Sequence, residues 1–500
     1  MRLILTALAM WMLVSCSAVT TRRPEPSSGV LIPAAALQHD VDVLQRAYES
    51  MHPGLYRYST PAQVSARFDA LRRGFAHDQS LESAFVAFSE FAATVRCGHT
   101  YPNFYNQPED IQQRLFKRSD RVPFHFRWID ERMIVVRNFS SDPRLSPGTE
   151  ILAIDDIPAR RILRTLMRSA RADGANDAKR RAYLEVQGDD AYEAFDIYLP
   201  LYFPEIGTSM RLDARSADGA TRFRTTVDAI GYETRLAERP TPPPKDAPAW
   251  TTHQPAPGVT VLDMPTWALY ESKWDWRAFL DATFEKLAAD GTQTLVIDVR
   301  RNEGGEDVGD VLLAHLADRD IPGESFQRLV RYQKAPEDLV PYLHTWDRSF
   351  LDWGNAAVRV DDRFYRLTKY DDDHGAGVIQ PRKPRFAGKV YVLVGPTNSS
   401  ATFQFAQAVK ESGLATLVGQ PTGGNQRGIN GGAFFFVALP GSKIEMDLPL
   451  IGRFPTRPRP DAGISPDVPV QTRPADLAAG EDAEMAWVLR SVSRASSARE

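Results

Sequence analysis

The second half of the chain contains three short apolar runs, each followed by a turn rich in glycine or serine. The runs with their turns are residues 294–305, 390–400 and 414–424. Each run predicts a buried strand, and helical apolar patterns lie between the runs. Strands that alternate with helices favour a βα-rich core. The turns that end the three strands are therefore where we look for chemistry.

Two serines, Ser399 and Ser400, stand where the second run passes into a helical pattern. A hydroxyl at the start of a helix lies beside unpaired amide donors and the positive end of the helix dipole, which suits a nucleophile. The same position is also common for a serine that only caps the helix. This unit alone leaves both interpretations open.

The first turn, Asn302-Glu-Gly-Gly305, ends in two adjacent glycines. Paired glycines after a strand let the backbone point its amides toward a ligand, which an oxyanion hole requires. The third turn also ends in two glycines, Gly423 and Gly424. The first turn is therefore predicted to hold negative charge that develops during a reaction.

Four sequence blocks occur in one order along the catalytic half, and two more precede them. The blocks are Asp298-Val-Arg-Arg-Asn-Glu-Gly-Gly305, Ser399-Ser-Ala401, Val418-Gly-Gln-Pro-Thr-Gly-Gly424 and Gly463-Ile-Ser-Pro-Asp467, preceded by His52-Pro-Gly-Leu-Tyr56 and Cys97-Gly-His-Thr-Tyr101. With them the sequence resembles the carboxyl-terminal processing (tail-specific) serine proteases, including their tricorn-like branch. The resemblance spans roughly residues 35–470.

The resemblance implies a role for each residue of the second block. The family nucleophile is the serine immediately before alanine, which is Ser400 here, and Ser399 becomes a loop or capping residue. The oxyanion donors would be the amide of Ala401 and one from Gly304 or Gly305. Ser400 is therefore the predicted nucleophile.

The general base departs from the bacterial pattern of the family, which is a Ser/Lys dyad. The lysine position corresponds to Asn425, and asparagine does not usefully accept a proton. A Ser/Lys mechanism would need a distant lysine, such as Lys410 or Lys443, to swing in. The tricorn-like branch uses a histidine from an earlier domain, and the resemblance implies His99 in that role. Imidazole suits general-base work near neutral pH.

A histidine base usually needs an acid that fixes its tautomer. Asp461 occupies the region where the related branch carries a carboxylate, and Asp467 is its rival. His52, beside proline and glycine, is interpreted as a turn residue. Cys97 is expected to be a small buried thiol rather than a nucleophile. No Cys or His pairs recur at ligand spacing, so we expect no metal or cofactor.

Composition limits the class of protein. The 500 residues are 43% hydrophobic and 25% charged, which is typical of soluble globular protein with sizeable cores. The formal net charge is −4, and no basic cluster alternates with aromatic residues. Nucleic acid is therefore not an expected partner.

The N-terminus predicts export. Met1-Arg2 and an apolar run at residues 3–14 resemble a signal peptide, and Leu13-Val-Ser-Cys16 resembles the bacterial lipobox. Lipidation of Cys16 would then anchor the chain, and Ser17 favours the outer membrane. The alternative is a chance cysteine in an ordinary signal peptide. With Cys16 acylated, Cys97 has no partner for an intrachain disulfide. We expect a periplasmic location in a Gram-negative-type envelope.

The predicted fold class is α/β multidomain. The expected segments are a lipoprotein signal peptide (1–16), a tether (17–33), a helical N-terminal domain (34–119), a PDZ-like α+β domain (120–236), a Pro-rich linker (237–250), a serine peptidase domain (251–472), and a C-terminal helix and tail (473–500). The PDZ-like label rests on residues 146–158, although an insertion near residues 168–191 blurs that match. The family resemblance implies a crotonase-like ββα catalytic core.

The leading functional hypothesis is a lipid-anchored envelope serine peptidase that works through an acyl-enzyme. Its partners would be a peptide or protein substrate and, through the anchor, a membrane. One alternative is a catalytically inactive peptidase fold that binds peptide or apolar ligands, for which the missing lysine is the main argument. Another is an esterase or amidase that acts on envelope components. Fold alone does not choose among them.

Overall fold

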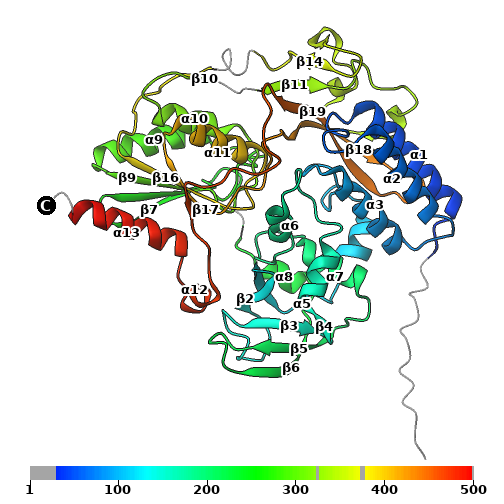
Figure 1. Cartoon of the computed structure of the whole chain (residues 1–500), viewed down its shortest axis with the longest axis horizontal. Coiled ribbons are helices and arrows are strands. Elements are labelled where there is room, and N and C mark those ends of the chain that lie inside the picture. Colours follow the sequence, from blue (N-terminus) through cyan, green and yellow to red (C-terminus); the bar gives the residue numbers. More distant parts are fainter. Residues whose placement is uncertain (1–29, 242, 323–325, 372–377, 498–500) are drawn as a thin grey trace, which may run out of the picture. The chain divides into compact units, whose positions relative to one another are not determined.

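The three apolar runs form adjacent parallel strands of one six-stranded sheet in the computed structural model of the chain (Figure 1). The strand order is β20-β17-β16-β9-β8-β7, and only β7 is antiparallel to its neighbour. The strands are β7 (Thr251–Ala256), β8 (Val259–Asp263), β9 (Thr294–Asp298), β16 (Lys389–Val394), β17 (Thr416–Gly419) and β20 (Val468–Pro469). This sheet confirms the predicted βα-rich core.

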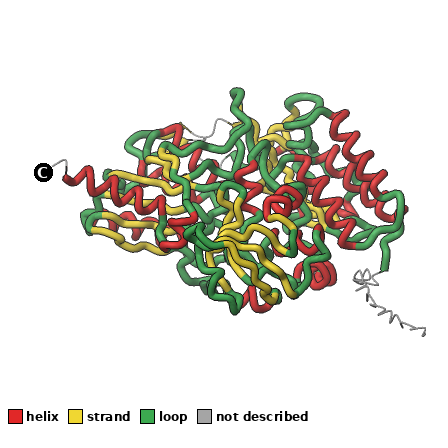
Figure 2. Tube along the Cα trace, turned by 60° about the horizontal axis from the view of Figure 1, so that its bottom comes forward, coloured by secondary structure: helices red, strands yellow, loops and turns green. Residues whose placement is uncertain are grey.

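Alternate residues of the central strand enter two different hydrophobic clusters. Val390, Val392 and Val394 pack in the cluster that includes α9, α10 and α11, whereas Tyr391 and Leu393 pack with α13 on the other face. Strand side chains alternate between faces, so a strand buried on both sides reads as a continuous apolar run. The covering helices are α9 (Trp276–Ala289), α10 (Val308–Leu316), α11 (Ser400–Ser412) and α13 (Ala483–Ser497), the last running along the strands in Figure 2.

A second sheet is built around a long hairpin near residues 430–455. Its order is β12-β18-β19-β11-β14-β13, and the long antiparallel pair β18–β19 forms its centre. The strands are β11 (Phe326–Val330), β12 (Leu343–His344), β13 (Ala357–Arg359), β14 (Tyr365–Leu367), β18 (Asn430–Ala438) and β19 (Glu445–Pro455). A two-stranded pair, β10 (Ile321–Pro322) with β15 (Val378–Ile379), and short 3₁₀ turns at Val340–Tyr342, Arg348–Leu351 and Gly354–Ala356 complete the region.

The helical N-terminal segment is confirmed by three helices and a short irregular fourth. They are α1 (Ala34–Met51), α2 (Pro61–Gly74), α3 (Leu81–Val95) and α4 (Glu109–Ile111), which continues as a π-helical turn at Gln112–Phe116. Helix α3 ends at Arg96, whose φ of 58° lies in the left-handed region that closes helices. The chain therefore turns sharply just before Cys97 and leads directly into His99.

The middle segment builds a third, antiparallel sheet in the order β1-β2-β3-β5-β6, with β4 paired to β3. Its strands are β1 (Phe124–Ile129), β2 (Arg132–Asn138), β3 (Glu150–Ile154), β4 (Ile157–Pro158), β5 (Ser209–Arg215) and β6 (Arg222–Asp228), and its helices are α5 (Ala159–Leu166), α6 (Asp177–Tyr183), α7 (Ala194–Tyr202) and α8 (Tyr232–Ala237). The insertion near residues 168–191 contains α6 and the loops on either side of it.

The C-terminal segment differs from the prediction of a single helix. It contains two helices, α12 (Pro474–Ala479) and α13, because Gly480 adopts a left-handed φ of 66° and ends the first. The described residues from Leu31 onward pack as one compact unit.

The structure describes residues 30–241, 243–322, 326–371 and 378–497. The predicted signal peptide, Cys16 and most of the tether lie outside these residues. Within them, no helix is both long and apolar enough to cross a membrane.

Candidate active site

Ser400 is the first residue of α11 and has a strained backbone. Its φ of 46° is uncommon for a residue other than glycine, and such outliers concentrate at functional sites. Ser399 precedes it at the capping position, but its side chain makes no capping hydrogen bond to a described residue. Instead the Ser399 carbonyl accepts a hydrogen bond of 2.8 Å from Thr402 Oγ1. The sharp turn from β16 into α11 therefore presents Ser400 at the start of the helix.

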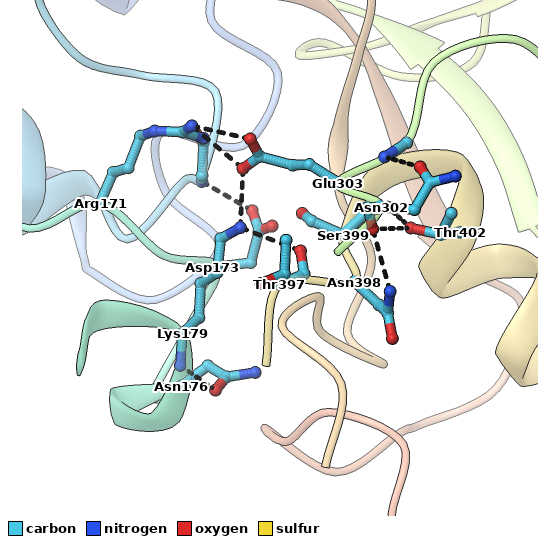
Figure 3. Close-up of polar contacts among 12 residues, drawn as sticks. Arg171, Asp173, Asn176, Lys179, Asn302, Glu303, Thr397, Asn398, Ser399 and Thr402 are labelled. Atoms are coloured by element: carbon cyan, nitrogen blue, oxygen red, sulfur yellow. Dashed lines mark hydrogen bonds and ion pairs between the residues drawn. The ribbon is translucent and has the colours of Figure 1, made fainter. Parts of the chain in front are cut away.

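The first turn is joined to the turn that carries this serine by buried amide and hydroxyl groups of Asn302, Asn398 and Thr402 (Figure 3). The Asn302 carbonyl accepts from Asn398 Nδ2 at 2.9 Å and from Thr402 Oγ1 at 3.0 Å. Asn302 Nδ2 donates to the Met264 carbonyl at 2.8 Å, and its Oδ1 accepts from the Gly304 amide at 2.9 Å. These bonds fix the first turn against the serine turn, although about 100 residues separate them in sequence.

Gly304 lies directly against Ser400. A Cβ atom on Gly304, whose φ is 125°, would come within 2.8 Å of Ser400 Cβ and 3.0 Å of the Ala401 amide nitrogen. Only glycine fits such a conformation and such a close approach. Because the Gly304 amide already donates to Asn302, Gly304 supplies space rather than a free donor. The amides of Gly305 and Ala401 stay the predicted oxyanion donors.

The third turn closes over the serine turn from the other side. The Asn398 carbonyl accepts from the amides of Gly423 at 2.6 Å and Gly424 at 3.0 Å. Asn176, which caps α6, donates to the carbonyls of Thr422 at 2.8 Å and Gly424 at 2.9 Å. The insertion from the middle segment thus contacts the catalytic half at this turn.

Residues 258–435 match the model of Peptidase family S41. The protein carries an S41 peptidase domain. Ser400 and the three turns lie inside the matched range, whereas His99 and Asp461 lie outside it. The match confirms the family resemblance inferred from the sequence blocks over this range and supports a serine-type peptidase. The histidine base stays a prediction.

Two solved structures of mature CPAF share the fold of this chain. Mature CPAF in complex with lactacystin matches with a TM-score of 0.60 at 15% identity, covering 89% of this chain and 95% of that one. A second mature CPAF structure matches with a TM-score of 0.57 at 15% identity, covering 89% and 94%. The photosystem II D1 C-terminal processing protease has a TM-score of 0.39 at 12% identity, covering 88% and 93%. No match is found among curated proteins.

His99 lies near the S41 domain in a desolvated setting. Its Nδ1 is buried and has no hydrogen-bond partner among the described residues. Burial and the charge of Arg171 lower the pKa of His99 to about 4, against an opposing effect of Glu303. The ring packs 5.8 Å from the ring of Phe434. No hydrogen bond of the described residues joins His99 to Ser400; such bonds are often long before substrate binds.

Arg171 links the histidine segment to the first turn of the S41 domain (Figure 3). Its Nη1 donates to the Gly98 carbonyl at 2.8 Å, and its Nη2 lies 3.0 Å from Glu303 Oε1. Lys179 Nζ donates to the same Glu303 oxygen at 2.7 Å and to the Thr397 carbonyl at 3.0 Å. Burial would raise the pKa of Glu303, but the two cations outweigh it and hold that pKa well below its usual range.

Asp173 holds the histidine segment from the opposite side. Its Oδ1 accepts from the Gly98 amide at 2.9 Å, while its Oδ2 is buried without a partner among the described residues. Burial raises the pKa of Asp173 to about 6. Sequence reasoning missed Arg171, Asp173 and Lys179. They lie in the insertion that blurred the PDZ-like match, and nothing in its local pattern marks them as contacts of the S41 domain.

Asn425, at the family lysine position, is buried and holds a carboxylate. Its Nδ2 donates to Asp461 Oδ1 at 2.7 Å, and that oxygen also accepts from the Ala175 amide at 2.9 Å. Burial of the amide and its hydrogen bonds give Asn425 a structural role in the turn. No described hydrogen bond joins Asp461 to His99, so Asp461 stays a prediction for the orienting acid.

The alternative acid and lysines occupy other contacts. Asp467 Oδ1 accepts from Lys410 Nζ, and its Oδ2 accepts from the Leu417 amide at 2.8 Å. Lys443 Nζ donates to the Pro440 carbonyl at 2.8 Å. The lysine that reaches the serine turn is Lys179, which the sequence did not indicate.

His52 and Cys97 support the histidine segment from inside the protein. His52 is fully buried, and its Nε2 lies 2.8 Å from Thr100 Oγ1, while burial lowers its pKa to about 3. Cys97 is buried and accepts from Asn430 Nδ2 at 3.2 Å, and burial raises its pKa to about 11. Such a thiol is a poor nucleophile. Cys97 is thus a small buried thiol, as expected, and His52 follows the last residue of α1.

One cavity of about 680 Å³ lies in the middle segment, away from Ser400. It is lined by residues around the π-helical turn at Gln112–Phe116 and around α8, among them Arg118 and Tyr232, and by none of the site residues described above. The candidate active site is therefore identified by its residues and their chemistry, and not by the volume of a cavity. Within the described ranges, no group of three or more His, Cys, Asp or Glu side chains is arranged to hold a metal ion.

Proposed function

We propose that this protein is an envelope serine peptidase in which Ser400 is the nucleophile and His99 is the general base. Ser400 Oγ attacks the peptide carbonyl carbon while the imidazole takes its proton, and the tetrahedral oxyanion accepts from the amides of Gly305 and Ala401. The imidazolium then gives the proton to the leaving amine, and the C–N bond breaks. Water, deprotonated by the imidazole, hydrolyses the acyl-enzyme and releases Ser400.

The observation that carries this proposal is the backbone at Ser400. A serine in a left-handed conformation, at the start of a helix and packed against a glycine turn, has no need of that strain if it only caps. Helix N-termini and exposed amides favour the negative charge that develops during acyl transfer. The strain is therefore best explained by a nucleophile aimed at a carbonyl.

His99 supports the proposal through its protonation state. With a pKa near 4, the imidazole is neutral at physiological pH and is able to accept a proton. Once it becomes imidazolium, the charge of Glu303 favours it, whereas Arg171 and Lys179 oppose it. Asp461 would complete a triad only if it moved from Asn425 to the imidazole, and we retain it as the proposed acid on that condition.

The remaining parts of the proposal concern architecture and location. We assign a PDZ-like character to the middle segment and a crotonase-like character to the catalytic half, in line with the family resemblance. Lipidation of Cys16 would place the protein at the periplasmic face of the outer membrane. Mass spectrometry of the mature N-terminus from membrane fractions tests this placement, and an unmodified Cys16 would exclude the anchor.

A second candidate is a non-catalytic fold that binds peptide or apolar ligands. The observation that favours it is the absence of a hydrogen bond between Ser400 and His99 among the described residues. An esterase or amidase acting on envelope components would use the same residues as the peptidase. Labelling tests the first alternative, and a comparison of peptide with ester substrates tests the second.

The deciding experiment is labelling of the purified full chain with a fluorophosphonate probe, followed by mass spectrometry of the adduct. We expect labelling on Ser400, none in Ser400→Ala, and full labelling in Ser399→Ala. His99→Ala should slow labelling by roughly 10²- to 10⁴-fold, the usual contribution of a general base. A folded wild-type chain that is not labelled would reject the catalytic proposal, and labelling of Ser399 would shift the nucleophile by one residue.

A further inference from the structure

An exposed aromatic surface lies beside the proposed base. Trp346 is 62% exposed, and its ring lies 5.9 Å from that of Phe434 and 5.8 Å from that of Phe436. We call Trp346, Phe434 and Phe436 the aromatic patch. Phe434 also packs 5.8 Å from the ring of His99, so the patch is continuous with the site.

The alternation of side chains along β18 builds the patch, and a buried aromatic ring supports it. Phe435 is fully buried in the core, so Phe434 and Phe436 point to the opposite face of the strand. The buried ring of Phe350 meets Trp346 edge-on at 5.5 Å. The patch therefore keeps its shape while exposing apolar surface, which is the usual mark of a binding surface.

Part of the strand edge beside the patch has no strand partner among the described residues. Strand β12 pairs with β18 only at Phe436 and Val437, so in the described residues no strand covers that edge over residues 431–435. A Cβ atom on Gly431 would lie 3.9 Å from His99 Cε1 and Nε2, so the missing side chain leaves room next to the imidazole. An open strand edge is where an extended peptide adds to a sheet.

We propose that the aromatic patch is a subsite that binds a large apolar side chain of the substrate close to the scissile bond. This inference rests on the proposed peptidase function. The occupant is an extended peptide, because an open strand edge and an apolar platform meet at the residue that transfers the proton. Aromatic rings supply a rigid apolar surface that lowers the free energy of a bound aromatic or aliphatic side chain. The enzyme therefore selects apolar segments of its substrates.

The test compares cleavage by the purified full chain with cleavage by three variants. Unfolded β-casein is digested, the cut sites are mapped by mass spectrometry, and a quenched peptide is made around the strongest cut. Each residue flanking the cut is then replaced in turn by Phe, Leu or Ala. Rates are expressed per Ser400 that a fluorophosphonate titrates. We expect one flanking position at which Phe exceeds Ala in kcat/KM by about tenfold, as expected for an apolar subsite.

Trp346→Ala should reduce that preference to within about twofold, and Trp346→Phe should keep most of it. The matched control is Val358→Ala, because Val358 is 50% exposed on β13, which lies at the opposite edge of the same sheet from β12. It should retain the preference. A wild-type preference that survives Trp346→Ala, or labelled wild-type enzyme that shows no apolar preference, would overturn the subsite. Failure of Ser400 to label would instead reject the peptidase function itself.

Discussion

Ser400 and His99 are positioned by two different kinds of structure. Ser400 is placed by backbone: a parallel strand ends, the chain turns with a φ of 46°, and a glycine turn packs against it. His99 is placed by side chains from elsewhere, since Arg171 and Asp173 hold the carbonyl and amide of the preceding glycine. The proposed nucleophile thus belongs to the S41 domain alone, whereas the proposed base depends on the middle segment.

This difference implies that the two halves of the site respond to different changes. A nucleophile placed by the backbone is displaced when its close packing is disturbed, so the rate should fall while the pH dependence is kept. A base held by charged side chains loses alignment gradually, and its pKa changes with the charges around it. Variants that separate rate from pH dependence therefore distinguish the two halves.

The largest effect is expected from Gly304→Ala. Its methyl group would occupy space 2.8 Å from Ser400 Cβ, so it must displace the nucleophile or the Ala401 amide. Loss of one oxyanion donor alone costs about 10²- to 10³-fold, and we expect fluorophosphonate labelling to fall at least that far. The pH dependence of any residual labelling should stay that of the wild type.

Gly219→Ala is the control for backbone strain. Gly219 has a positive φ of 76° but has no atom within 4 Å of an added Cβ. This variant should lose some thermal stability and keep its labelling rate. If Gly304→Ala labelled at the wild-type rate, the close packing at Ser400 would have no role in the reaction.

Arg171→Gln should produce the next largest effect. It removes the bond to the Gly98 carbonyl and one of the two cations on Glu303. A displacement of about 1 Å at a catalytic group costs up to about 10²-fold, so we expect labelling to slow by about 10- to 100-fold. The charge of Arg171 lowers the pKa of His99. Its removal should therefore also move the fall of the labelling rate at acid pH, the acid limb of the pH profile, to higher pH.

Two variants sharpen this result. Arg171→Lys keeps the charge and should leave the acid limb close to the wild-type position. Arg168→Gln removes an exposed arginine in the same segment, which pairs with Glu90 at 2.9 Å, and should change neither rate nor pH dependence. A slower rate in Arg171→Gln without any shift of the acid limb would mean that Arg171 has only a structural role.

The sequence predicted the surroundings of Ser400 far better than the contacts that hold His99, for physical reasons. Glycine pairs and a serine between a strand and a helix are local signals, because backbone geometry restricts which residues fit there. The parallel strands could also be predicted from the sequence, since burial on both faces requires continuous apolar runs. Accordingly the core strands and the turns that carry Ser400 and Gly304 lie where the sequence predicts them, and Ser400 stays the predicted nucleophile.

The base half depends on contacts that a local pattern does not encode. Arg171 and Glu303 lie 132 residues apart and meet only through tertiary packing. The insertion around α6 resembled an interruption of the middle segment, yet Asn176 and Lys179 contact the turns around Ser400. The prediction for the C-terminal segment was wrong for a local reason, because Gly480 divides the predicted single helix into two.

The next largest effect is expected in the pH dependence of the wild-type labelling rate. Burial and Arg171 lower the pKa of His99 to about 4, so the imidazole is neutral above that pH and protonated below it. The labelling rate should therefore be flat from about pH 5.5 to 8 and fall tenfold for each unit below about pH 4. Circular dichroism at each pH shows whether the chain is still folded. An acid limb near 6.5 would indicate a solvated histidine and contradict the desolvated site.

The smallest effect is expected from Asp461→Asn, which tests whether the two halves share an acid. In the structure Asp461 accepts from Asn425 and the Ala175 amide, while His99 Nδ1 has no partner among the described residues. If that arrangement persists during the reaction, labelling should slow by less than about threefold, because a carboxamide oxygen still accepts from the Ala175 amide. Asn425→Ala, which removes the same contact from the other side, should behave alike. If Asp461→Asn alone slowed labelling nearly as much as His99→Ala, Asp461 would have to move to the imidazole. The base would then be oriented in part by the catalytic half of the chain.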